Sequence, residues 1–118
     1  MAIPTPYPIM NQNAGQKWGG QPKCIAIDMP TSAASVVEDQ DCFILFFTIC
    51  NGTGAAVQVI IQDGQNPPLN LINQSLAPGG TVSGGAEYGL PMPGGITWSA
   101  AADGVHGRIV WVKPSIKP

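Results

Sequence analysis

The chain has 118 residues, enough for one domain and too few for two packed cores. Only 10% of these residues are charged, against roughly a quarter in ordinary soluble domains, and the formal net charge is −2. Because no Lys or Arg lies between Cys24 and Gly107, the sequence offers no basic cluster that could bind nucleic acid. A small domain with so little surface charge is expected to cover part of its outside with other chains, which favours assembly over catalysis.

Residues 1–22 are predicted to form an extended N-terminal arm. Prolines at positions 4, 6 and 8 hold the backbone extended and remove amide donors, and the segment has no helix or strand period. The beginning of the chain also lacks the basic and apolar regions of a secretory signal, so synthesis in a cytosol-like compartment is expected. The arm either docks on a neighbouring chain or folds back on its own domain. The side chains able to dock it are Ile3, Tyr7, Ile9 and Trp18.

Residues 23–118 are predicted to form an all-β domain. No segment has the apolar spacing of a helix, and turn residues separate short apolar runs. Strands are expected at 24–27, 35–37, 42–50, 55–62, 69–73, 81–83, 96–101 and 108–113. Residues 88–95 are expected to form a Pro- and Gly-rich loop, and residues 103–107 a tight connection. This pattern predicts an antiparallel β-sandwich or jelly roll of about seven to eight strands.

The strongest strand signal is at residues 42–50, which are rich in aromatic and β-branched side chains. Strict alternation would place Phe43, Leu45, Phe47 and Ile49 on one face, and Ile44 and Phe46 on the other. Both faces are therefore apolar, which predicts a second covering layer and favours an apolar contact between subunits. The turn Asn51-Gly52-Thr53-Gly54 predicts an antiparallel hairpin between this strand and residues 55–62.

Few residues are candidates for chemistry. The only histidine, His106, is expected to be solvated in a loop, and Glu38–Asp41 is interpreted as a solvated turn rather than a cation site. Cys24, Cys42 and Cys50 lack zinc-site spacing and are expected to be buried free thiols. No catalytic residue, metal site or cofactor is predicted, since an enzyme would need a cluster of His and carboxylates.

The tryptophans leave two interpretations open. Trp98 and Trp111 fall on predicted strands, where they are expected to pack against the core or a subunit contact. Aromatic residues exposed on one sheet face could instead stack on sugar rings, which would favour a carbohydrate-binding module; the candidates are Tyr7, Trp18, Tyr88, Trp98 and Trp111.

The order of turns and strands over residues 51–113 resembles small β-structured virion proteins of tailed bacteriophages. The resemblance rests on these stretches: Asn51-Gly52-Thr53-Gly54, Asp63-Gly64, Leu69-Asn70-Leu71, Leu76-Ala77-Pro78-Gly79-Gly80-Thr81-Val82, Leu90-Pro91-Met92-Pro93-Gly94-Gly95-Ile96-Thr97-Trp98 and Gly107-Arg108-Ile109-Val110-Trp111. Proteins of this kind include capsid decoration (cement) proteins and head or tail accessory proteins, which are often trimeric β-sandwiches or jelly rolls.

The resemblance implies a capsid decoration protein that binds and stabilises the assembled shell. Its implied partner is the major capsid protein, its implied state a homotrimer, and its implied location the capsid exterior after synthesis in the host bacterial cytoplasm. No membrane partner is expected, because the longest apolar run is far shorter than the ~20 residues of a membrane span. The basic residues near the chain ends could meet acidic patches of the shell or of a neighbouring subunit; they are Lys17, Lys23, Lys113 and Lys117. The alternative is a carbohydrate- or receptor-binding β-sandwich of a phage tail or cell-surface assembly.

Overall fold

A computed structural model describes residues 21–32 and 35–114. Within these residues all regular structure is β-strand, which confirms the all-β prediction. The predicted docking residues of the arm lie outside the described residues; they are Ile3, Tyr7, Ile9 and Trp18. Their role, and the extended arm itself, stay predictions.

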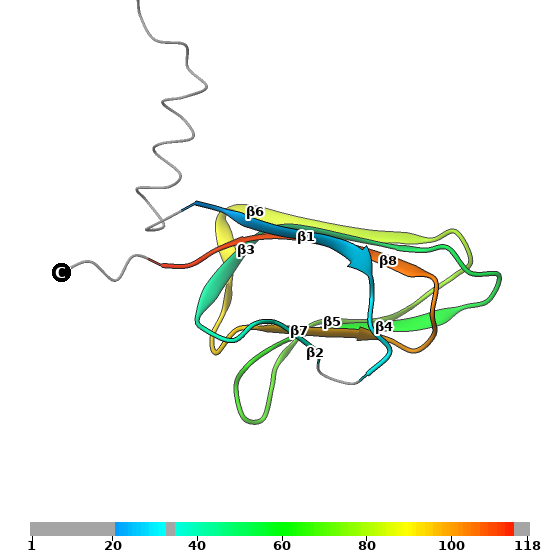
Figure 1. Ribbon diagram of the computed structural model, residues 1–118, viewed down its shortest axis with the longest axis horizontal. Coiled ribbons are helices and arrows are strands. Elements are labelled where there is room, and N and C mark those ends of the chain that lie inside the picture. Colours follow the sequence, from blue (N-terminus) through cyan, green and yellow to red (C-terminus); the bar gives the residue numbers. More distant parts are fainter. Residues whose placement is uncertain (1–20, 33–34, 115–118) are drawn as a thin grey trace, which may run out of the picture.

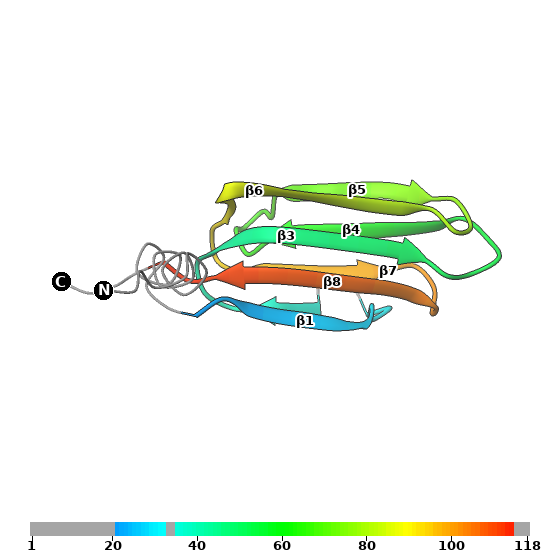
Figure 2. The same cartoon turned by 90° about the horizontal axis from the view of Figure 1, so that it is seen from above.

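Eight strands form two antiparallel sheets of four strands each, which lie face to face (Figure 1). The strands are β1 (Lys23–Asp28), β2 (Ser35–Glu38), β3 (Cys42–Asn51), β4 (Val57–Asp63), β5 (Asn70–Leu76), β6 (Thr81–Met92), β7 (Ile96–Ala100) and β8 (Val105–Val112). The first sheet has the order β1-β8-β3-β6 and the second the order β2-β7-β4-β5. β1 begins and β8 ends at the same end of the molecule (Figure 2).

The strand pairing follows a simple rule along the chain. The first strand pairs with the last, the second with the seventh, the third with the sixth and the fourth with the fifth. The four pairs can be drawn as one long antiparallel ribbon. One half of the ribbon consists of β1 to β4, and the other half consists of β5 to β8. Two further pairings, β3 with β8 and β4 with β7, close the ribbon into two sheets. Successive strands in each half therefore alternate between the sheets.

The predicted hairpin between residues 42–50 and 55–62 is wrong, because β3 and β4 lie in different sheets. Both edges of β3 are already occupied by β6 and β8, so β4 has no free edge to pair with. Asn51, at the end of β3, is buried, and its side-chain amide donates to the carbonyls of Ala55, Leu76 and Ala77 at 2.8, 2.9 and 3.2 Å. These hydrogen bonds fix a connection that crosses from one sheet to the other.

The predicted faces of the strongest strand are also wrong, because β3 contains a bulge at Leu45. The pairing with both neighbouring strands shifts between Ile44 and Phe46. Ile44 points inward before the bulge, and Phe47 and Ile49 point inward after it. The inward positions therefore change from even-numbered to odd-numbered residues at the bulge. The expectation of a second layer is confirmed, because these inward side chains lie in the core between the sheets. Phe46 points outward and is 46% exposed.

Two predicted connections are shorter than expected. β6 runs on to Met92, although residues 88–95 were expected to be a loop, and its register with β3 jumps from Gly85 to Leu90. The intervening residues form a bulge that contains Gly89 at φ 88°, which explains why the sequence there has loop composition. β8 likewise begins at Val105, so the connection predicted over residues 103–107 is tighter than expected.

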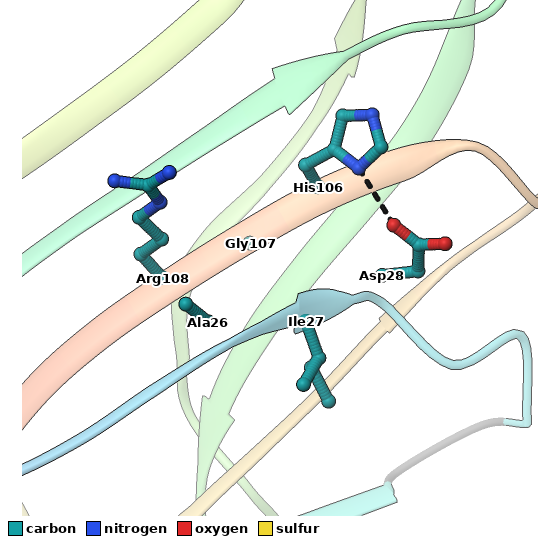
Figure 3. Close-up of a pocket in the computed structure, with 6 residues that line it drawn as sticks. All are labelled: Ala26, Ile27, Asp28, His106, Gly107 and Arg108. Atoms are coloured by element: carbon teal, nitrogen blue, oxygen red, sulfur yellow. Dashed lines mark hydrogen bonds and ion pairs between the residues drawn. The ribbon is translucent and has the colours of Figure 1, made fainter.

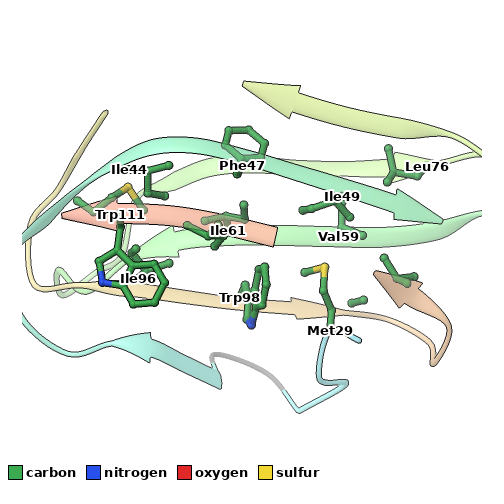
Figure 4. Close-up of a cluster of buried hydrophobic side chains, with 14 of the residues drawn as sticks. Met29, Ile44, Phe47, Ile49, Val59, Ile61, Leu76, Ile96, Trp98 and Trp111 are labelled. Carbon is green, nitrogen blue, oxygen red and sulfur yellow. The ribbon is translucent and has the colours of Figure 1, made fainter. Parts of the chain in front are cut away.

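A single apolar core fills the space between the sheets (Figure 4). Trp98 and Trp111 are 2% and 6% exposed, which confirms that both tryptophans pack inside. Ile44 and Ile49 from one sheet face Ile61 from the other, and each is fully buried. At about 25 cal/mol per Å² of apolar area, burial on this scale is the main favourable term in folding.

Gly107, the third residue of β8, packs closely against core side chains. A Cβ built there would lie 2.6 Å from Cζ3 of Trp98 and 2.8 Å from Cγ of Met29. Both neighbours are themselves buried and cannot move aside without displacing the core. Glycine is therefore required at this position by packing.

We expect Gly107→Ala to lower the free energy of unfolding by about 1–3 kcal/mol through overpacking. Gly54→Ala is the matched control, because a Cβ at that exposed turn meets no atom within 4 Å. It should leave stability unchanged or raise it by up to about 1 kcal/mol. Urea denaturation of both variants measures the difference. Equal midpoints for the two variants would contradict the packing at Gly107.

Candidate functional site

Glu38 forms a buried polar centre at the end of the sandwich where β1 begins and β8 ends. Its side chain is 6% exposed, and its Oε1 accepts a hydrogen bond from the indole Nε1 of Trp111 at 3.0 Å. Nζ of Lys113 lies 3.6 Å from Oε2, and Nζ of Lys23 lies 3.9 Å from Oε1. One carboxylate therefore holds the first strand, the last strand and the second sheet together.

The balance of these contacts lowers the pKa of Glu38. Burial alone raises it, but the hydrogen bond from Trp111 and the charges of Lys113 and Lys23 outweigh burial. The expectation that Glu38–Asp41 is a solvated turn is thus wrong at Glu38. The residue lies opposite Ile96 on β7, and this register points its side chain inward.

Lys23 and Lys113 lie beside a carboxylate of their own chain. These two residues were among the basic side chains expected to meet other chains. Asp41, in the same acidic stretch, accepts a hydrogen bond from the backbone amide of Gly94 at 2.7 Å and so ties two loops together. The charges at this end therefore serve the fold of the chain itself.

The three cysteines lie in three different environments. All are free thiols; Cys24 is exposed, Cys42 is buried and Cys50 is half-buried. Burial, together with the negative charges of Glu38 and Asp41, raises the pKa of Cys42 to about 12. The expectation of three buried thiols is correct for Cys42 and wrong for Cys24, because Cys24 lies on an outward position of an edge strand.

His106 is exposed, as expected, but it lies on β8 rather than in a loop. Its Nδ1 is 2.6 Å from Oδ1 of Asp28 on the neighbouring strand β1 (Figure 3). Asp28 and His106 line a shallow depression on the outer surface of the first sheet, together with Ala26 and Arg108. In the described part of the chain, no group of three or more His, Cys, Asp or Glu residues is placed to hold a metal ion.

The outer face of the second sheet has a distinctive composition. Its outward positions follow from the register of β2, β7, β4 and β5 and from their alternating burial. We call this surface the amide face, and its residues are Val36, Gln58, Ile60, Gln62, Asn70, Asn73, Ser75, Thr97 and Ser99. Within the described residues, none of these paired outward positions carries a charged side chain.

Amide side chains on this face bind one another. The side-chain nitrogen of Gln62 donates to Oδ1 of Asn70 at 2.9 Å, and Gln58 donates in the same way to Asn73. The outer face of the first sheet differs, because Asp28 and Arg108 occupy paired outward positions there. Strand register was the information that sequence reasoning lacked, since alternation alone does not say which strands share a sheet.

Comparisons with known proteins return no match: no family model, curated protein or solved structure is significantly similar to this chain. Within the described residues, no helix is long and apolar enough to cross a membrane.

We expect Glu38→Gln to lower the free energy of unfolding at pH 7 by about 1–3 kcal/mol, because it removes the charge that the indole and two ammonium groups stabilise. A lowered pKa in the folded state gives stability that is present above the unfolded pKa and lost as the pH falls through the folded pKa. The difference between wild type and variant should therefore shrink below about pH 4.5. Denaturation at a series of pH values measures it.

Asp39→Asn is the control for this prediction, since it removes one charge from the exposed neighbouring residue. We expect it to change stability by no more than about 0.5 kcal/mol. If Glu38→Gln and wild type lost stability in parallel as the pH fell, Glu38 would not be the stabilising carboxylate described above.

Proposed function

We propose that this chain is a structural protein of a virion, a capsid decoration protein that binds the assembled shell and acts through contacts rather than chemistry. The observation that carries the proposal is the amide face, a sheet surface without charged side chains at its paired outward positions, on a chain that has few charges in total. The cores of protein interfaces are depleted of charge, whereas free surfaces of small domains normally carry it. The amide face is therefore suited to being covered.

The strand order supports a jelly-roll assignment for this sandwich. A single antiparallel ribbon of eight strands, rolled so that successive strands alternate between two sheets, describes the pairing β1–β8, β2–β7, β3–β6 and β4–β5. Jelly rolls occur in viral capsid proteins, lectins and cupins. This range includes the proposed function but does not select it, since one fold hosts many functions.

We assign the amide face to contacts between copies of this chain, in a homo-oligomer for which a trimer is the favoured state. Two copies can approach through this face without bringing like charges together, although each carries a net charge of −2. The hydrogen bonds Gln58–Asn73 and Gln62–Asn70 hold the long amide side chains in place before contact. Pre-ordering of this kind reduces the side-chain entropy lost on association.

The contact with the major capsid protein is assigned to the N-terminal arm, through Ile3, Tyr7, Ile9 and Trp18. In the folded domain, β1 begins at Lys23, which lies opposite Trp111 of β8 and whose Nζ is 3.9 Å from Oε1 of Glu38. A fixed exit point limits the volume that a tethered segment explores, and so favours its binding to a site on the same lattice. This docking implies a location on the capsid exterior.

The alternative, a carbohydrate-binding module, has less support. Trp98 and Trp111 could stack on sugar rings only if they were exposed, and both are buried in the core. The amide face could hydrogen-bond to hydroxyl groups, but its paired outward positions carry no aromatic ring within the described residues. The buried tryptophans therefore favour the structural function.

Particles made with and without the chain test the proposal. We expect the chain to co-purify with assembled capsids, and capsids that lack it to rupture at a lower temperature, because a ligand of the assembled state stabilises that state by linkage. Trp18→Ala should reduce occupancy more than Lys17→Ala, since exposed ion pairs contribute only about 0–1 kcal/mol. Absence of the chain from capsids, or equal rupture temperatures with and without it, would overturn the decoration function.

A further inference from the structure

The outer face of the first sheet brings an acid, a base and a thiol into one row across three adjacent strands. Asp28 of β1 lies opposite His106 of β8, and His106 lies opposite Cys50 of β3. Directly opposed residues on antiparallel strands point to the same face, with Cβ atoms about 4.5–5.5 Å apart. The exposure of Asp28 and His106 places this row on the outer surface.

Asp28 determines which ring nitrogen of His106 is available. Oδ1 of Asp28 lies 2.6 Å from Nδ1, and this contact fixes Nδ1 as the protonated nitrogen of a neutral ring (Figure 3). Nε2 is then the nitrogen that can accept a proton, as in the acid–base–nucleophile arrangement of hydrolases.

Nε2 is directed toward β3, the strand that carries the thiol. A Cβ built on Gly52, just after the end of β3, would lie 3.0 Å from Nε2. Gly52 follows Cys50 by two residues, so Nε2 lies over the end of β3, beyond Cys50 along the strand. The His106 side chain is 59% exposed, and a change of the Cys50 χ1 rotamer can bring the thiol toward Nε2 while the ring keeps its contact with Asp28.

We propose that Cys50 is a modification site: a nucleophilic thiol whose proton passes to Nε2 of His106, with Asp28 as the positioning residue. Its reaction partners are carbon electrophiles that carry a leaving group. In the step, the sulfur forms a bond to carbon, the leaving group departs with its bonding electron pair, and the imidazolium later releases the proton to solvent. This inference is independent of the proposed structural function.

The other two cysteines provide controls within the same molecule. Cys24 is more exposed than Cys50, but it lies opposite Val110 and has no histidine beside it in the sheet register. Cys42 is buried, with a pKa raised to about 12, so it should not react in the folded chain. If access alone decided reactivity, Cys24 would react fastest and no change at His106 would matter.

Alkylation of the full chain by iodoacetamide, followed by peptide mass spectrometry, tests the proposal. We expect His106→Gln to slow alkylation of Cys50 about tenfold or more, below the roughly 10²–10⁴-fold that general acid–base catalysis typically contributes, while Cys24 changes by less than about twofold. The pH dependence of the Cys50 alkylation rate should lose the step that depends on His106. The pH dependence of the Cys24 alkylation rate should not change. His106→Gln leaves Asp28 and Arg108 unchanged, and these are the charged residues at paired outward positions of this sheet.

Asp28→Asn separates positioning from a structural effect. It should slow Cys50 by a smaller factor and shift its pH profile, because the ring is no longer held in one tautomer. Continued protection of Cys42 in the same digest reports that each variant is folded. A Cys50 rate that is unchanged in both variants would overturn the proposal, as would equal slowing of Cys24 and Cys50.

Discussion

Packing of two sheets across one apolar layer is the constraint on which the other features depend. Each strand must keep its large side chains on the inward side, and β3 does so only by changing phase at the Leu45 bulge. The layer is closed at one end by the bond from Trp111 to Glu38. Near its middle it has no room for a side chain at Gly107, where Trp98 and Met29 meet the backbone.

The core also determines what is left for the outer faces. Inward positions take most of the large apolar side chains, and the outward positions of the second sheet carry uncharged polar and amide residues together with Val36 and Ile60. Charges are placed where they support the fold: Glu38 joins strand ends, and Asp41 ties two loops together. The two sheets therefore differ outside, one uncharged and suited to self-contact, the other with an acid, a base and two thiols on its outward positions.

The sequence predicted the strand content well, because turn residues and short apolar runs are local signals. It failed where a distant partner decided the outcome. The turn at Asn51 has hairpin composition, yet its buried amide binds Leu76 and Ala77, far along the chain. Glu38 looked solvated because nothing local shows that Trp111 lies beside it. The row from Asp28 through His106 to Cys50 joins three distant segments, so only strand register could reveal it.

The central claim is that copies of the chain meet through the uncharged amide face, and inserting one charge on each sheet tests it directly. Thr97→Glu places a carboxylate on the amide face, and Thr48→Glu places the same group at a half-buried outward position of the other sheet. Size-exclusion chromatography with light scattering should find wild type and Thr48→Glu as oligomers and Thr97→Glu as a monomer, with all three giving the same circular dichroism spectrum. A Thr97→Glu variant with the mass of the wild-type oligomer, or a monomeric wild type at micromolar concentration, would contradict the claim.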